Sequence, residues 1–466
     1  MIRARSAIVN QLFAEGIEMA ARESNAHAFT GVTVLPMTDV PPQRDQTVLV
    51  RDGSIAAIAP SASYKLPPDA IAIDGRGKFL MPGLCDMHIH MFFPREPDLT
   101  EAETLRRSRE YLYLFLCRGV TTVRNMAGVP LHLRMRAEVA DGTTLGPRIF
   151  TSGPILETRF THKMLIGIGK EVRTPAEARA EVLANHRDGY DFIKVYNDID
   201  ADIYDTIIAT SREVGLKVIG HVAFVKGLTG ALAAKQDSIE HLRSYDFAAD
   251  TRASPPGKRF EGWLHTTPAR MAEMAERTAA AGVWNVPTLV TESGIGADGD
   301  APVPQDLSGL PGWIDRQLRA DNMASVFTNE QRTAIKAGAP MRQAFVAALD
   351  RAGANLMTGT DTPVLRLVPG RSLLREIELF VEGGVPTLHA LQHATIRAAE
   401  FLGIEATTGT VQVGKRADLL LLDGDPLADI AALRRQAGVM VAGTWLPTET
   451  LQATLAQFDT AEAVTA

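Results

Sequence analysis

Two histidines separated by one residue, His88 and His90, end an apolar segment that begins near Phe79 and passes through Pro82 and Gly83. In a β-strand, side chains two positions apart point to the same face. A strand that ends at His90 therefore directs both imidazoles into one space. Two neutral imidazoles that converge in this way supply half of a metal site. Taken alone, the pair is also compatible with ordinary surface or core histidines, so the rest of the chain has to decide.

Four further residues with suitable side chains lie at or near the ends of later β-like segments. They are Lys194, His221, His241 and Asp361. Each has a structural explanation of its own, such as a satisfied core histidine or a carboxylate that caps a turn. In a barrel of parallel strands, however, the carboxyl ends of the strands form the active face. Several such side chains on one predicted rim favour a metal site over a set of unrelated roles.

The elements that must position these residues are predicted within 81–404, where strand-like and helix-like segments alternate. Strands are predicted at 84–90, 120–125, 148–152, 192–196, 217–221, 238–241, 283–289 and 355–361. Helices are predicted between most of them, including 101–116, 176–187, 203–214 and 269–281. This alternation is typical of an α/β protein with a (β/α)₈ TIM barrel. Two long insertions, 244–266 and 291–311, are expected to be binding loops or lids, and the sequence does not reveal their function.

Short β-like segments also occupy both ends of the chain. They predict a small β-sandwich domain built from the two ends around the barrel. The expected parts are an N-terminal helix and the first half of this domain in 1–80, the barrel in 81–404, and the second half with a C-terminal tail in 405–466. Residues 1–26 are predicted to form an amphipathic helix, whose role stays open.

Composition limits the possible functions. The 466 residues are 45% apolar and 22% charged, which is ordinary for a globular protein. A net charge of -7 without a basic run argues against a nucleic-acid partner. The two cysteines, Cys85 and Cys117, leave neither a disulfide framework nor a cysteine-based zinc site. We expect no membrane partner and a cytoplasmic location, because no apolar stretch nears the roughly 20 residues of a membrane span and residues 1–26 do not read as a signal peptide.

The set of residues resembles the amidohydrolase superfamily. The superfamily's opening signature is similar to MPGLCDMHIH at residues 81–90, with Cys85 where an aliphatic residue is commoner. Its closing segment is similar to GTVQVGKRADL at residues 409–419. Over about residues 28–445, the chain resembles the imidazolonepropionase-like group, which includes metal-dependent prolidases and Xaa-Arg dipeptidases.

This resemblance implies a centre of two divalent metal ions, with zinc as the expected metal and carboxylated Lys194 as the bridge. An ammonium group has no lone pair for a metal, but a desolvated lysine can lose its proton and form a carbamate with CO₂. The alternative is a lysine that is paired with a carboxylate inside the barrel. If the carbamate is present, the buried ion is held by His88, His90 and Asp361, and the outer ion by His221 and His241. These ligands also accept manganese or cobalt.

The same resemblance implies a mechanism. Two metals about 3.5–4 Å apart can share a bridging hydroxide, which would attack the substrate carbonyl. Asp361 would take the hydroxide proton and pass it to the leaving nitrogen. Mononuclear deaminases use a glutamate beside their middle histidine, whereas His221 is followed by Val-Ala-Phe at 222–224. The lysine and the missing glutamate favour hydrolysis over deamination.

The leading hypothesis is hydrolysis of an amide bond in a dipeptide or an N-acyl amino acid. A second is hydrolysis of a lactone, urea, carbamate or cyclic amide on the same metals. A third is a barrel that has lost catalysis and only binds, although the complete ligand set argues against it. The expected partners are a small-molecule substrate and further copies of the chain, because members of the group often self-associate.

Three residues are candidates for contact with the substrate. Tyr196, two residues after Lys194 on the same strand face, could donate to a developing oxyanion or only pack. Arg124, at the end of the second strand, could bind a substrate carboxylate or neutralise carboxylates of the rim. His162, in the loop after the third strand, could reach the substrate or face solvent.

Overall fold

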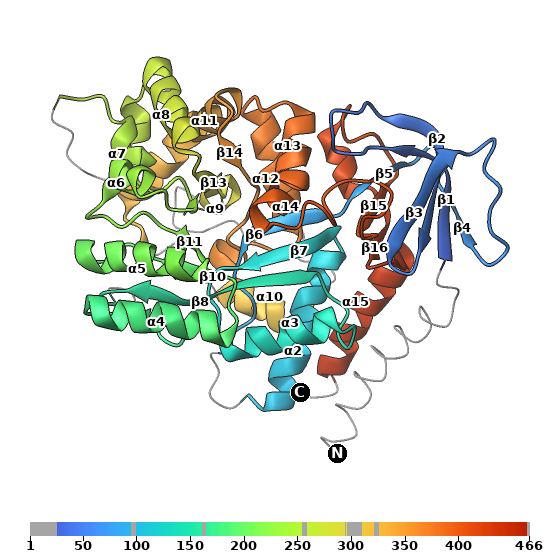
Figure 1. The fold of residues 1–466 in the computed structure, drawn as a ribbon, viewed down its shortest axis with the longest axis horizontal. Helices are drawn as coiled ribbons and strands as arrows, with labels where there is room; N and C mark the ends of the chain where they lie inside the picture. The colour runs from blue at the N-terminus through green and yellow to red at the C-terminus, as the bar shows by residue number, and fades with distance from the viewer. Residues whose placement is uncertain are drawn as a thin grey trace.

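The computed structural model describes residues 26–94, 99–160, 165–253, 259–293, 295, 310–320 and 326–463. The expected helix in 1–26, the loop with His162 and most of the insertion 291–311 lie outside these residues. The chain forms a barrel of parallel strands and a smaller sheet beside it (Figure 1). Among the described helices, none has both the length and the apolar character needed to cross a membrane.

The barrel strands follow one another in chain order, and neighbouring strands run parallel. They are β6 (Leu84–Ile89), β7 (Val120–Asn125), β8 (Arg148–Glu157), β10 (Phe192–Val195), β11 (Lys217–Gly220), β12 (Ser238–Glu240), β13 (Trp284–Val286) and β14 (Asn355–Leu356). The first strand is joined to the segment after the last one, because Met87 N donates to Thr358 O at 3.0 Å and His90 N donates to Thr362 O at 2.8 Å. The predicted (β/α)₈ barrel is therefore confirmed.

Helices alternate with these strands. They are α2 (Glu101–Leu116), α3 (Pro130–Ala140), α4 (Pro175–Asp188), α5 (Ala201–Val214), α6 (Gly227–Ala233), α7 (Tyr245–Ala249), α8 (Pro268–Ala281), α9 (Leu289–Ser293), α10 (Gly312–Ala320), α11 (Asn329–Arg351), α12 (Arg371–Glu382), α13 (Thr387–His393) and α14 (Ile396–Leu402). Local signals fix their ends: α4 begins where the Thr174 side chain accepts from Glu177 N, and it ends at Gly189 with a φ of 84°. Within the insertion 244–266 the described residues form α7 and a 3₁₀ helix, Glu261–His265.

The smaller sheet takes strands from both chain ends, as predicted. They are β1 (Ala26–Val34), β2 (Gln43–Arg51), β3 (Ser54–Pro60), β4 (Ile71–Asp74), β5 (Phe79–Pro82), β15 (Leu419–Leu422), β16 (Gln436–Val441) and β17 (Thr444–Pro447). The order is β17-β16-β15-β5-β1-β2-β3, with β4 paired to β1, and Leu80 of β5 lies opposite Leu421 of β15. The blue and red strands therefore lie side by side in Figure 1, and α15 (Thr448–Ala463) follows them.

The smaller sheet also sets where the first barrel strand begins. Only Gly83 separates β5 from β6, and a Cβ at Gly83 would lie 2.2 Å from Thr121 Oγ1. Glycine is therefore required for the chain to pass from one sheet to the other at this point. The strand that carries the two histidines is anchored at its start by this passage.

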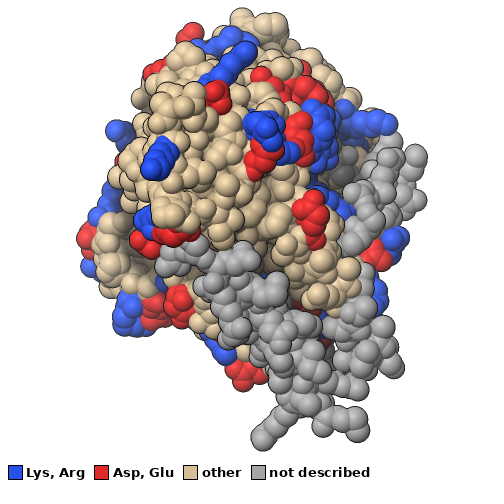
Figure 2. All heavy atoms as spheres, turned by 90° about the vertical axis from the view of Figure 1, so that its right-hand side faces the viewer, with Lys and Arg blue, Asp and Glu red and all other residues tan. Residues whose placement is uncertain are grey.

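The face over the smaller sheet carries charges of both signs. Figure 2 shows Lys and Arg side chains next to Asp and Glu side chains across the described part of this face. In the smaller sheet and its loops, Arg51 pairs with Asp69 and Arg76 pairs with Asp74. On this face the described residues form no continuous basic surface.

A buried glutamate of α12 gives a test of the fold by pH. The Glu376 carboxylate is fully buried and accepts from the backbone N–H groups of Leu289 (3.0 Å) and Val290 (2.7 Å), at the start of α9. Burial raises the pKa of Glu376 to about 8. An acid with a raised folded-state pKa makes the protein lose stability as pH rises from its unfolded-state pKa, near 4.5, towards 8.

In the unmodified protein, Glu376 is expected to lower the free energy of unfolding by about 1 kcal/mol for each pH unit across that window. Glu376→Gln should abolish this dependence on pH. The measurement is urea unfolding of metal-free protein between pH 5 and 8. Glu405→Gln, at an exposed position, serves as the matched control. A Glu376→Gln curve with the same pH slope as the unmodified protein would contradict the expectation.

Candidate metal centre

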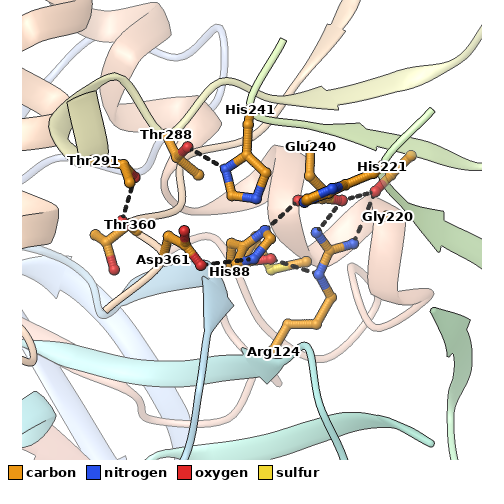
Figure 3. Close-up of polar contacts among 12 residues, drawn as sticks. His88, Arg124, Gly220, His221, Glu240, His241, Thr288, Thr291, Thr360 and Asp361 are labelled. Atoms are coloured by element: carbon orange, nitrogen blue, oxygen red, sulfur yellow. Dashed lines mark hydrogen bonds and ion pairs between the residues drawn. The ribbon is translucent and has the colours of Figure 1, made fainter. Parts of the chain in front are cut away.

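Three side chains from distant strands meet at the carboxyl-end face of the barrel. Ligand atoms of His88, His241 and Asp361 all lie within 4.8 Å of one another, and no further His, Cys, Asp or Glu joins this group in the part of the chain that is described. His88 Nε2 lies 3.2 Å and His90 Nε2 lies 3.0 Å from Asp361 Oδ1. Figure 3 shows His88, His241 and Asp361 turned toward one another. The group draws on members of both of the expected ion sites.

Backbone conformation turns two of these residues into the site. His241 follows β12 with a φ of 60°, and Asp361 follows β14 with a φ of 67°. Non-glycine residues seldom adopt this left-handed conformation, and such strain is concentrated at functional sites. Asp361 is held in place through its neighbour, since the buried Asp86 carboxylate accepts from both Thr360 N (3.0 Å) and Thr360 Oγ1 (2.8 Å).

In three of the histidines, Nδ1 lies within hydrogen-bond distance of an oxygen atom of another side chain. The contacts are His88 Nδ1 to Glu240 at 2.7 Å, His221 Nδ1 to Asn197 Oδ1 at 2.8 Å, and His241 Nδ1 to Thr288 Oγ1 at 2.7 Å. The Glu240 carboxylate and the Asn197 amide oxygen can only accept, so they favour the tautomers of His88 and His221 that leave Nε2 as the lone-pair donor, whereas the Thr288 hydroxyl orients His241 and can take either role. His88 Nε2 is buried, and Asp361 Oδ1 lies 3.2 Å from it without an aligned hydrogen bond. A buried imidazole nitrogen beside a carboxylate oxygen in this way fits a pair of metal ligands.

The charge states also fit a divalent cation. Burial, with a contribution from Arg243, lowers the pKa of His221 well below its ordinary value, and burial does the same for His241. Burial opposes ionisation of Asp361, but His241 and His88 outweigh it and hold the pKa of that carboxyl well below its usual range. His221 and His241 therefore favour the neutral form and Asp361 the ionised form, and imidazole with carboxylate is a donor set that suits zinc and similar ions.

Lys194 of β10 has the properties that carbamate formation requires. The residue is 1% exposed, and its side chain makes no hydrogen bond or ion pair with a described residue. Burial lowers the pKa of Lys194 to about 8, so a sizeable fraction is uncharged near neutral pH. Only the uncharged amine can react with CO₂. The alternative of a lysine paired with a buried carboxylate finds no partner among the described residues.

A sequence model of the amidohydrolase family matches residues 79–446. The chain belongs to the amidohydrolase family. It is a metal-dependent hydrolase that acts on carbon–nitrogen bonds. The predicted membership is confirmed, and the barrel, the smaller sheet and the polar site described above are the family's framework in this chain.

Curated relatives match only part of the chain. An adenine deaminase of Ruegeria sp. (strain TM1040) is 27% identical over 164 residues, which cover 30% of this chain and 27% of the deaminase. An enamidase of Eubacterium barkeri is 29% identical over 175 residues, which cover 31% of this chain and 42% of the enamidase. The matches thus span less than half the length of these relatives.

Solved structures match nearly the whole chain. A Bifidobacterium longum protein provisionally named a prolidase is 25% identical, with a TM-score of 0.69 over 93% of this chain and 99% of its own. A bottromycin amidohydrolase is 22% identical, with a TM-score of 0.72 over 96% of this chain and 93% of its own. A Xaa-Pro dipeptidase with bound methionine is 21% identical, with a TM-score of 0.68 over 91% of this chain and all of its own. The last two matches establish the likeness of fold alone.

The amidohydrolase site opens into a cavity of about 950 Å³. Its wall includes His90, Lys194 and His221 together with the three clustered ligand candidates, so all six predicted ligands face one space. Tyr196 also lines it: its ring stacks on that of His221 with a centroid distance of 4.1 Å, and burial raises the pKa of Tyr196 to about 12. The phenol therefore keeps its proton and can both pack and donate.

The suggestion that Arg124 binds substrate does not fit its position. Arg124 is 0% exposed and lies outside the cavity wall, where its Nη2 donates to Glu240 Oε1 at 2.8 Å and its Nε donates to Met87 O at 2.6 Å. The positive charge of Arg124 is balanced by the Glu240 carboxylate, and this carboxylate also contacts His88 Nδ1 (Figure 3). The alternative role that the sequence left open, neutralising a carboxylate, is the one that this geometry supports.

Sequence reasoning missed the carboxylate that links the metal centre to the barrel interior. Glu240 precedes His241 in a buried strand, and both of its oxygens are used, one by His88 and one by Arg124. The available signal was an acidic residue inside a strand that is otherwise predicted to be buried, since such a charge needs a partner. Asn197 and Thr288, which hold the other histidines, carried no comparable signal.

Proposed function

We propose that the chain is a binuclear amidohydrolase that cleaves the amide bond of a dipeptide or an N-acyl amino acid. The observation that carries this proposal is the convergence of neutral imidazoles, ionised Asp361 and unpaired, buried Lys194 on one cavity. The provisional name of the Bifidobacterium longum protein, a prolidase, supports an amide-bond substrate. The Xaa-Pro dipeptidase and the bottromycin amidohydrolase share the fold in which such chemistry occurs.

In this proposal zinc is the expected metal and Lys194 carries the bridging carbamate. The ligands would be His88, His90, Lys194, His221, His241 and Asp361. When bound, such ions lower the pKa of a water molecule towards 7 and polarise a carbonyl oxygen. Every one of these residues lies at or near the carboxyl end of a barrel strand and lines the cavity, so all six could hold ions there.

The side chains of the chain would then move protons and orient groups. Asp361 is ionised and would take a proton from the attacking water and deliver it to the leaving nitrogen. The Tyr196 hydroxyl, which keeps its proton, would donate to the oxyanion that develops on the substrate carbonyl. Glu240, Asn197 and Thr288 would keep the three imidazoles in a fixed orientation.

The proposal is tested by metal content and by product identity. Protein purified without chelator is expected to contain two metal equivalents per chain by elemental analysis. A substrate panel is expected to release amines from dipeptides or N-acyl amino acids, and His90→Ala, which removes a ligand, should abolish release. One equivalent per chain would contradict a binuclear centre. Release of hydroxyl groups from lactones, without amine release, would instead favour the second class of substrate.

Carboxylation of Lys194 has its own readout. Protein equilibrated with ¹³C-bicarbonate is expected to show a carbamate carbon resonance that is missing in Lys194→Met. Lys217→Met, which alters a half-buried lysine on the neighbouring strand β11, serves as the control and should keep the resonance. A spectrum without this signal in the metal-loaded protein would rule out the bridge.

A further inference from the structure

The guanidinium of Arg243, beside the metal centre, has no hydrogen-bond or ion-pair partner among the described residues. Arg243 lies two residues after His241 and lines the cavity. Its Nε is buried without a hydrogen bond, and its guanidinium makes no hydrogen bond or ion pair with any described residue. A buried polar nitrogen without a partner is costly, and guanidinium groups match carboxylates with two parallel hydrogen bonds. The arginine therefore needs an anion that the described chain does not supply.

None of the nearby acids that the structure describes forms an ion pair with Arg243. Glu292 also lines the cavity, but it pairs with Arg342. Asp246 is buried close to Arg243, yet its Oδ2 accepts from Phe260 N at 2.8 Å. Glu240, just before His241, is used by other partners. Among the described residues no acid pairs with Arg243, so an anion from a molecule that enters the cavity would be its partner.

Arg243 lies close to the metal ligands, because it follows His241 by two positions and lines the same cavity. Its charge contributes to the lowered pKa of His221 and of His241. Arg259 also lines the cavity with a buried, unpartnered Nη2, but its guanidinium lies over the Phe260 ring at 4.5 Å, and Arg107 pairs with Glu103. An anion on Arg243 would thus be held beside the residues that surround the reacting carbonyl.

Other parts of the cavity wall are apolar and aromatic. Phe92 and Trp313 pack edge to face with centroids 5.0 Å apart, and Phe260 and Phe327 do so at 5.9 Å. Ile155 and other aliphatic side chains complete this lining. The cavity has a volume of about 950 Å³. With such walls it can accommodate a bulky apolar acyl group in addition to an amino acid.

We propose that Arg243 binds the free carboxylate of the substrate, and that the substrate is an N-acyl amino acid or dipeptide whose acyl part is large and apolar. The inference rests on the proposed amide hydrolysis and narrows its substrate class. The carboxylate belongs to the amine product, and the aromatic wall takes the acyl product. A substrate with its carboxylate converted to a carboxamide loses the interaction and is a poor substrate.

The test compares N-phenylacetyl amino acids with their carboxamides in Arg243→Ala. For the free acid, kcat/KM is expected to fall by about 100–1000-fold, mainly through KM, because a charge-assisted pair is lost. For the carboxamide it should change by less than about threefold. Added guanidinium ion should restore part of the free-acid activity, and Arg243→Lys should keep part of it. Arg252→Ala, which removes a surface arginine that pairs with Asp250, is the matched control.

Binding supplies a second readout that does not need turnover. Isothermal titration of metal-free protein with the free acid should show binding that Arg243→Ala and Arg243→Gln lose while their metal content after reloading is unchanged. Equal losses for the free acid and the carboxamide would overturn the inference. If no panel member releases amine but binding still depends on Arg243 and on the carboxylate, the proposed function fails and the carboxylate site stands.

Discussion

Replacing Asp361 with asparagine is expected to lower kcat for amide hydrolysis by about 10³–10⁴-fold, with a much smaller change in KM. Asparagine keeps the size of the side chain and its contact with His90, now 3.0 Å from Oδ1, but it cannot take a proton at neutral pH. Asp361 is ionised because the neighbouring imidazoles overcome the effect of burial on its pKa. The loss should therefore fall on the proton-transfer step rather than on substrate binding.

The Asp361→Asn measurement has to separate proton transfer from metal loss. Steady-state kinetics are compared at equal metal content, since an amide is a weaker ligand than a carboxylate. Asp350→Asn is a matched control: that half-buried aspartate contacts His393 at 2.8 Å and His389 at 3.0 Å and is not part of the cavity wall. It should retain activity within about threefold. A metal-loaded Asp361→Asn protein with kcat within tenfold of that of the unmodified protein would contradict the proposed role of Asp361 in proton transfer.

The clustering of the ligand candidates could be predicted without any contact information. Parallel strands of a barrel end at one face, so residues at strand ends as far apart as His88 and Asp361 are brought together by topology alone. The positions of these strands could be predicted from the sequence because a glycine precedes each of β6 and β7. Both strands are buried along their whole length. The fold and the gathering of the ligands therefore followed from periodicity and chain order.

The contacts that orient these ligands were not predictable in the same way. Arg124 and Glu240 are 116 positions apart in the sequence. Their pairing depends on the register of neighbouring strands around the barrel, which hydrophobic periodicity and secondary-structure propensity do not determine. The turn of His241 into the site depends on a φ of 60° at a non-glycine residue, which local preferences disfavour. For this reason the sequence left both roles of Arg124 open, binding of a substrate carboxylate and neutralisation of a carboxylate of the barrel.

Removing the carboxylate of Glu240 is the second change with a large expected effect. Glu240 and Arg124 are both fully buried, and burial disfavours the carboxylate charge, but Arg124 outweighs it and lowers the pKa of Glu240 to about 2. Glu240→Gln leaves the guanidinium buried without its counter-charge. We expect a loss of about 3–5 kcal/mol in the free energy of unfolding of metal-free protein, measured by urea denaturation. Glu273→Gln, in an exposed pair with Arg270, should change it by less than about 1 kcal/mol.

A double variant separates the two roles of Glu240. Glu240→Gln combined with Arg124→Met removes both buried charges, so most of the lost stability should return. Metal affinity should not return, because His88 Nδ1 no longer donates to a carboxylate, and a loss of about 10–100-fold is expected in a competition titration against a chromophoric chelator. Recovery of affinity together with stability would mean that Glu240 acts only by balancing Arg124. Persistence of the affinity loss in a stable protein would identify Glu240 as the residue that positions His88 for the metal.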